Sequence, residues 1–229
     1  MKRPLEILGR GAEFAVLFVG VPLLVRFAPE ISKATGRFIY IPVIPVLIAG
    51  GIFSYIVLRK TTDFQPHDIV ALAGTTRRDW LMMLGRFAFF AVVLTVLLLL
   101  WNPHALFSLP RTHPGVWVAV MLLYPIVSVT PQGIIYRALY VKRYAPMFPQ
   151  PVRLLAGAIV FSFAHLAFAN HVTLVFTFIG GLLFLPTYKR TGSMFLSNIE
   201  HALYGDLIFT LGWGSYFFHR GTLEIISKT

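Results

Sequence analysis

The residues able to do chemistry fall into three short groups in the C-terminal half of the chain, each inside an apolar stretch. The groups are Gln132, Gly133, Tyr136 and Arg137; Phe161 and His165; and Glu200, His201 and Gly205. Ionisable side chains are costly to bury in such surroundings, so they mark a functional site. Two imidazoles on separate helices could hold a water molecule or a divalent metal such as zinc.

The spacing within each group predicts which side chains share a helix face. Residues four apart are neighbours on a helix. This relation holds for Gln132 with Tyr136, Gly133 with Arg137, Phe161 with His165, and His201 with Gly205. Glu200 and His201 are adjacent, so they point about 100° apart. Arg137 lies deep in an apolar stretch, and we expect it either to pair with a carboxylate or to cap a helix end.

Several common catalytic patterns are missing from the sequence. There is no cysteine, which excludes disulfides, thiolate metal sites and a cysteine nucleophile. The zinc-protease pattern HExxH, the GxSxG elbow and a Ser-Lys pattern are also absent. Catalytic zinc usually has three protein ligands. The candidate metal ligands are therefore His165 and His201, with Glu200 as the third.

The elements that must position these residues are membrane-spanning helices. The chain has 229 residues, of which 57% are hydrophobic and 13% charged. Apolar runs approach the roughly 20 residues that span a bilayer, and they lack the strict alternation of barrel strands. We expect an all-α, polytopic bundle of about seven spans, with an eighth, short or re-entrant segment left open. The expected spans are 11–28, 38–58, 82–101, 115–140, 152–170, 172–188 and 193–212.

The net charge of +11 belongs to the connections between spans, which argues for a membrane protein and against a nucleic-acid-binding one. Lys and Arg gather in the N-terminal segment and in the second, fourth and sixth connections. These segments share one side if the N-terminus is cytoplasmic. Glu13, Arg26 and Arg86 lie near span ends, where we expect structural roles. Trp80, Trp101, Trp117 and Trp213 are expected at the membrane interfaces.

We find no internal repeat and no linker, so residues 1–229 are expected to form a single membrane domain. Residues 1–114 would supply scaffold spans, and residues 115–212 would carry the polar groups. Pro125 and Pro131 each remove a backbone hydrogen bond, and a bend there could open the helix beside a polar cavity. The partners expected are the lipid bilayer and a peptide or lipidated protein, and no nucleic acid.

The three groups resemble the motifs of the CPBP family, the CAAX-protease and bacteriocin-processing group of intramembrane metalloproteases, also called Abi or Rce1-like. Its pattern is Glu-Glu-x-x-x-Arg, then Phe-x-x-x-His, then His-x-x-x-Asn/Asp, each on its own transmembrane helix. The corresponding residues here are Gln132, Gly133 and Arg137; Phe161 and His165; and His201 and Gly205. The resemblance implies an intramembrane metalloendopeptidase of the bacterial inner membrane, multi-pass, with catalytic residues Gln132, Gly133, Arg137, His165 and His201. It places Tyr136, Phe161 and Gly205 in the substrate cavity.

Two positions depart from that pattern. The family's glutamates are thought to activate the hydrolytic water, and Gly133 cannot act as a base. Gly205 replaces the residue that closes the third motif, with Asp206 next to it. Three functions therefore stay open: an Rce1-like endopeptidase, a catalytically inactive relative that binds a peptide, lipid or membrane partner, and a transporter or channel.

Overall fold

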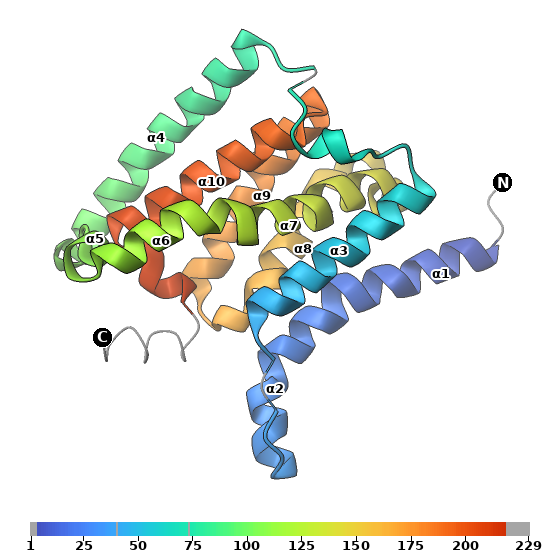
Figure 1. The fold of residues 1–229 in the computed structure, drawn as a ribbon, viewed down its shortest axis with the longest axis horizontal. Helices are drawn as coiled ribbons and strands as arrows, with labels where there is room; N and C mark the ends of the chain where they lie inside the picture. Colours follow the sequence, from blue (N-terminus) through green and yellow to red (C-terminus); the bar gives the residue numbers. More distant parts are fainter. Residues whose placement is uncertain (1–3, 40, 73, 219–229) are drawn as a thin grey trace.

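A computed structural model describes residues 4–39, 41–72 and 74–218. Over these ranges the chain is built from helices, without strands. Six segments are long and apolar enough to cross a membrane. They are Leu8–Thr35, Val43–Thr61, Arg77–Trp101, Pro114–Met147, Gln150–Phe168 and His171–Thr191. The protein is therefore a multi-pass membrane helical bundle (Figure 1).

Each span contains one or more helical elements. The first joins α1 (Pro4–Ala15), η1 (Val16–Gly20) and α2 (Val21–Thr35), and the next two are α3 (Val43–Thr61) and α4 (Arg77–Trp101). The long fourth span contains α6 (Pro114–Tyr124), η4 (Pro125–Val129), α7 (Thr130–Gly133), η5 (Ile134–Tyr144) and η6 (Ala145–Met147). The fifth contains η7 (Gln150–Val152), α8 (Arg153–Phe163) and η8 (Ala164–Phe168), and the sixth is α9 (His171–Thr191).

A seventh helix, α10 (Met194–Leu211), completes the bundle and lies alongside the fourth span (Figure 1). It is less apolar than the other six because it carries Asn198, Glu200, His201 and Asp206. The described helices thus agree with the expected count of about seven. The largest differences are at the first and fourth spans, which extend beyond the expected 11–28 and 115–140.

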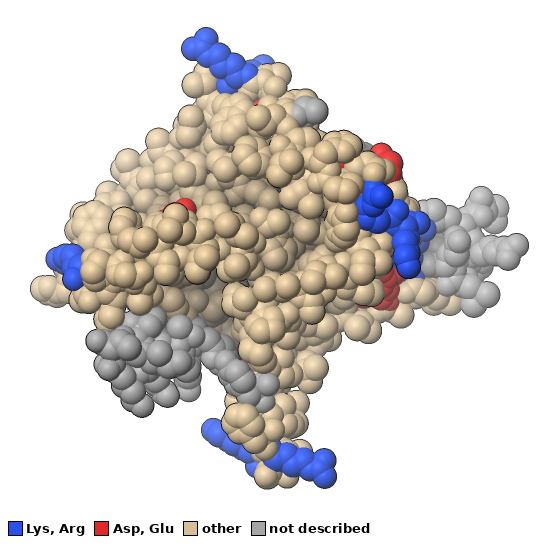
Figure 2. All heavy atoms as spheres, viewed as in Figure 1, with Lys and Arg blue, Asp and Glu red and all other residues tan. Residues whose placement is uncertain are grey.

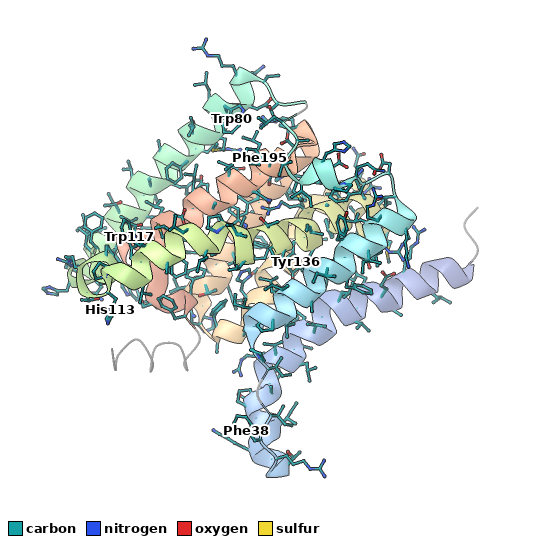
Figure 3. The ribbon with its side chains drawn as sticks, in the orientation of Figure 1. Phe38, Trp80, His113, Trp117, Tyr136 and Phe195 are labelled. Atoms are coloured by element: carbon teal, nitrogen blue, oxygen red, sulfur yellow. The ribbon has the colours of Figure 1, made fainter. Side chains whose placement is uncertain are left out.

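The prolines of the fourth span change the helix geometry without ending the helix. Pro125 opens the π-helical segment η4, and a second π-helical segment, η5, follows Gly133. A π-helix bonds residues five apart, which accommodates a missing donor and widens the helix locally. Gln132 and Gly133 lie between the two segments. Tyr136 lies in the middle of this helix, near its crossing with α3 (Figure 3).

Local capping residues fix where three of the helices begin. Thr76 accepts a hydrogen bond from the Asp79 amide, and Asp79 Oδ2 accepts one from the Thr76 amide, which forms a capping box at the start of α4. Asn170 caps α9 by accepting a hydrogen bond from the Thr173 amide, and Ser193 caps α10 by accepting one from the Leu196 amide. Gly192, at a φ of +69°, ends α9 in the left-handed region that glycine adopts without strain.

The basic connections meet at one end of the bundle. Lys142 Nζ lies 2.6 Å from Asp63 Oδ1, and this hydrogen bond lowers the pKa of the Asp63 carboxyl. Ser193 Oγ donates to the Ala71 carbonyl at 2.7 Å. At the opposite end the Phe107 amide donates to the Leu211 carbonyl at 2.8 Å. These contacts place the second, fourth and sixth connections together, as the charge pattern predicted.

The face seen in Figure 2 is almost free of charge in its middle, and Lys and Arg lie at its margins. Such a distribution suits a surface covered by lipid between two charged ends. Trp80 lies at the start of α4, and Trp117 lies in the first turns of α6 at the other end (Figure 3). Both positions agree with tryptophans at the two interfaces.

Two of the charged residues expected near span ends are paired. Arg143 donates from Nε to both Glu13 carboxylate oxygens at 3.1 Å, which links η5 to α1. Arg26 Nη1 lies 2.7 Å from Glu30 Oε1 on the same helix. Both pairs have the structural role that the sequence suggested. The Glu13 pair lies beside the largest apolar cluster, which contains Phe18, Tyr140 and Tyr144.

The cysteine-free chain allows the two ends to be tested by single-cysteine labelling. His67→Cys and Gln150→Cys place a thiol at exposed positions of the basic end, and His104→Cys and Thr112→Cys do so at the other. A membrane-impermeant maleimide should label the first pair from one side only and the second pair from the opposite side. Labelling of both pairs from the same side would contradict this arrangement. The parent chain, without cysteine, is the control.

Candidate active site

A cavity of about 1100 Å³ lies between the helices, and its lining is mostly apolar. It contacts α2, α3, α4, α6, α8, α9 and α10. Among the described residues, none with a charged side chain lines it. The polar side chains that line the cavity include those of Tyr124, Gln132, His165 and His201. The cavity can therefore take a largely apolar ligand, with its chemistry limited to hydroxyl, amide and imidazole groups.

The first motif presents two faces of one helix, as its spacing predicted. Gln132 and Tyr136 line the cavity. Gly133 and Arg137 instead face Asn198 on α10. Gln132 Nε2 donates to Ser128 Oγ at 2.8 Å, which leaves Gln132 Oε1 without a hydrogen-bond partner among the described side chains. That oxygen is buried inside the bundle.

Arg137 is 3% exposed and links the fourth span to α10. Its Nη2 donates to Asn198 Oδ1 at 2.6 Å and to the Val129 carbonyl at 3.3 Å. Its Nη1 donates to the Ser197 carbonyl at 3.3 Å. The sequence left open a carboxylate partner or a helix cap for this residue. The observed partners are carbonyl and amide oxygens, so the guanidinium is solvated by neutral groups.

The place of a side chain at position 133 is already filled. A Cβ atom built on Gly133 would lie 2.7 Å from Arg137 Nη2 and would collide with Asn198 Oδ1. The hydrogen bond between Arg137 and Asn198 therefore crosses the space that a longer residue would need. Gly133 has no side chain that could act as a base. Because it has no Cβ, it also leaves room for this contact between the helices.

His201 is 5% exposed and is held from two sides. Arg137 Nη1 lies 3.5 Å from His201 Nδ1, and Tyr124 Oη lies 3.0 Å from His201 Nε2. Arginine only donates hydrogen bonds, so Nδ1 is the acceptor and the proton belongs on Nε2. Phe184 stacks on the ring with a centroid distance of 4.6 Å. The imidazole is therefore fixed as an N–H donor toward Tyr124.

His165 has the opposite arrangement. Its Nδ1 lies 2.8 Å from the Phe161 carbonyl oxygen, which can only accept, so Nδ1 carries the proton. Nε2 is then the unprotonated nitrogen, on a side chain that lines the cavity. The Phe161 ring contacts both imidazoles, with centroid distances of 5.0 Å to His165 and 5.5 Å to His201. The two histidines thus meet at one cavity, one as acceptor and one as donor.

Glu200 lies on another face of α10, as the angle between adjacent residues predicted. It is fully buried, with Oε1 2.8 Å from Arg86 Nη2. Arg86 Nη2 also donates to Thr187 Oγ1 at 2.8 Å. Arg86 is therefore an ion-pair partner within the bundle, nine residues beyond the first residue of α4. The pair joins α4, α9 and α10.

The residues present do not fit a divalent metal. Within the described ranges no three His, Cys, Asp or Glu side chains gather as a metal site requires. His201 Nδ1 faces the Arg137 cation, and its Nε2 is bonded to Tyr124. Glu200 faces Arg86 and does not line the cavity. Of the expected ligands His165, His201 and Glu200, only the two histidines line the cavity, one fewer than the three protein ligands that catalytic zinc usually has.

Sequence reasoning missed Tyr124 and the pairing of Arg86. Tyr124 reaches His201 from a different helix, 77 residues away in sequence, and no spacing rule connects the two. The sequence places Arg86 near a span end because the predicted span starts at 82, whereas α4 begins at Arg77. Asn198 had a signal, since it lies one turn from His201 and could join a polar contact there.

A substitution at position 133 should be destabilising. Gly133→Ala places a methyl group against Arg137 and Asn198, and overpacking of this kind costs about 1–3 kcal/mol. The melting temperature in lipid nanodiscs should fall. Equal melting temperatures of the parent and Gly133→Ala would show that the space is not filled as described.

The Glu200 carboxylate should stabilise the folded protein through its ion pair with Arg86. Glu200→Gln leaves the Arg86 guanidinium without its counter-ion. Because Arg86 is partly exposed, we expect a loss on the order of 2 kcal/mol. Arg86→Gln is the matched variant and should cost a similar amount. Chelator treatment of the parent should leave its melting temperature unchanged. A chelator effect that disappears in Glu200→Gln would identify Glu200 as a metal ligand.

One comparison with known proteins finds a match. Residues 114–205 match the family model described as type II CAAX prenyl endopeptidase Rce1-like. No curated protein and no solved structure matches the chain. The matched residues carry all three motifs and Tyr124. The Rce1-like family resemblance predicted from these motifs is therefore confirmed over the segment that supplies the two histidines of the cavity.

Proposed function

We propose that this protein is an Rce1-like intramembrane endopeptidase that hydrolyses a peptide bond in a peptide or lipidated protein. The observation that carries the proposal is the meeting of His165 and His201 at one apolar cavity, one as acceptor and one as donor. The lining suits a substrate with a long apolar group. The family match supports a function of the CAAX-protease type.

The proposed base is His165. With no carboxylate among the described residues of the cavity wall, the free Nε2 of His165 is the group able to take a proton from water. A positioned general base contributes typically 10²–10⁴-fold. The water oxygen would attack the carbonyl carbon, and His165 would then return the proton to the leaving amine.

The proposed role of His201 is to hold the hydrogen-bond donors of the site in position, because its own Nε2–H is already bonded to Tyr124. Fixed donors aimed at developing charge act strongly in a site that excludes water. Arg137 holds His201 so that its Nε2–H points toward Tyr124. No step is assigned to a metal, because the donor set does not fit one.

A second candidate is a catalytically inactive relative that binds the same substrates. The contact between Arg137 and Asn198 favours it, because that contact occupies the space beside Gly133 where the family has a glutamate. The cavity and its apolar lining would then serve binding alone. The two candidates share a substrate class and differ in turnover.

We further propose that the protein lies in the bacterial inner membrane with its N-terminus in the cytoplasm. The support is the gathering of the basic connections at one end of the bundle. Such connections stay on the cytoplasmic side in membrane proteins.

Cleavage of a prenylated CAAX peptide by the full chain in nanodiscs tests the proposed function. The parent should cleave, and His165→Ala should lower the rate by about 10²-fold or more. His165→Gln keeps a side chain of similar length and should be equally inactive. His171→Ala, at an exposed position outside the cavity wall, is the matched control and should keep the parent rate.

Introducing the family's glutamate separates the two candidates. Gly133→Glu with Asn198→Ser restores a carboxylate and removes the side chain that blocks it. A parent without cleavage and a double variant with cleavage would establish the inactive relative. Peptide binding without cleavage in every variant would also establish the inactive relative. Cleavage by the parent that is lost in His165→Ala would support the endopeptidase.

A further inference from the structure

We propose that Tyr124 contacts the substrate directly. In this assignment the Tyr124 hydroxyl accepts a hydrogen bond from His201 and donates its own proton to the carbonyl oxygen of the bound peptide. The inference rests on the proposed function, because it names a further binding group at the same site. Tyr124 lies at the end of α6, outside the three motifs.

The direction of the hydrogen bonds supports this role. Arg137 fixes Nδ1 of His201 as an acceptor, so His201 donates from Nε2 to Tyr124 Oη, 3.0 Å away. A hydroxyl that accepts one bond still has its own proton to donate. Tyr124 is half-buried and lines the cavity, so that proton is available to a ligand there.

The space around Gly205 supports it independently. A Cβ atom built on Gly205 would lie 2.6 Å from Tyr124 Oη and would collide with the ring. The phenol therefore occupies the volume that a larger residue would take at the end of the third motif. The ring also packs edge-on against Phe209, at a centroid distance of 5.8 Å. Tyr124 and a side chain at position 205 exclude one another, and this chain has the tyrosine.

The charges around the pair strengthen the hydroxyl as a donor. The bonds run from the Arg137 guanidinium to His201 and from His201 to Tyr124. Hydrogen bonds in such a series polarise one another in a low dielectric. A carbonyl oxygen that becomes negative during hydrolysis would be stabilised by the donor at the end of the series.

Paired binding measurements test the role of Tyr124 without requiring turnover. One probe is a prenylated CAAX peptide, and the other is the same peptide with an (E)-alkene in place of the scissile amide, which keeps the shape and removes the carbonyl. In the full chain, Tyr124→Phe should weaken binding of the amide peptide about threefold to tenfold and leave alkene binding unchanged. Tyr55→Phe removes a hydroxyl outside the cavity lining and should change neither.

A double variant tests the exchange with position 205. Tyr124→Ala with Gly205→Asn moves the polar group onto α10 and should restore the preference for the amide peptide, which Tyr124→Ala alone should lose. Equal effects of Tyr124→Phe on both peptides, or none on either, would overturn the inference and leave the proposed function standing. A double variant without the amide preference would also overturn it. A parent that binds neither peptide would overturn the proposed function and the inference together.

Discussion

The site depends on one buried guanidinium group. Arg137 lies between the fourth span and α10, where its partners are the oxygens of Asn198, Ser197 and Val129 and a nitrogen of His201. A cation in a membrane interior is costly unless such groups solvate it. Satisfying it brings α10 against the motif helix. The same contacts set the tautomer of His201, so the solvation of one charge orients the neighbouring imidazole.

Two glycines make this arrangement possible. Gly133 leaves room for the contact between Arg137 and Asn198, and Gly205 leaves room for the Tyr124 ring. At each position a side chain from another element fills the volume. Interiors are closely packed, so a missing side chain is normally accommodated by its neighbours. The two departures from the family pattern are therefore packed features of this chain, and each places a polar group near His201.

An ion pair inside the bundle keeps α4 in place. Arg86 and Glu200 join α4 to α10, and Arg86 also reaches Thr187 on α9. Apolar contacts gain little between helices in lipid, whereas polar contacts across helices hold them together. The pair also keeps the Glu200 carboxylate away from the cavity. The cavity lining described is thus neutral, and its acid–base chemistry is limited to imidazole and phenol.

The sequence by itself determined the class of fold and the identity of the polar positions. Apolar runs of span length predict helices because no backbone group can stay unpaired in lipid. Four-residue spacing correctly placed Gln132 with Tyr136 and Gly133 with Arg137, since local helix geometry decides these faces. It also separated Glu200 from His201 by their angle around the helix.

Contacts between helices were decided by the tertiary structure alone. The meetings of Tyr124 with His201, Asn198 with Arg137, and Arg86 with Glu200 join residues on different helices, 61 to 114 residues apart in the sequence. No periodicity within one helix shows which face of another helix it will meet. For this reason the sequence predicted two histidines in the membrane, and only the packed bundle made one a donor and the other an acceptor.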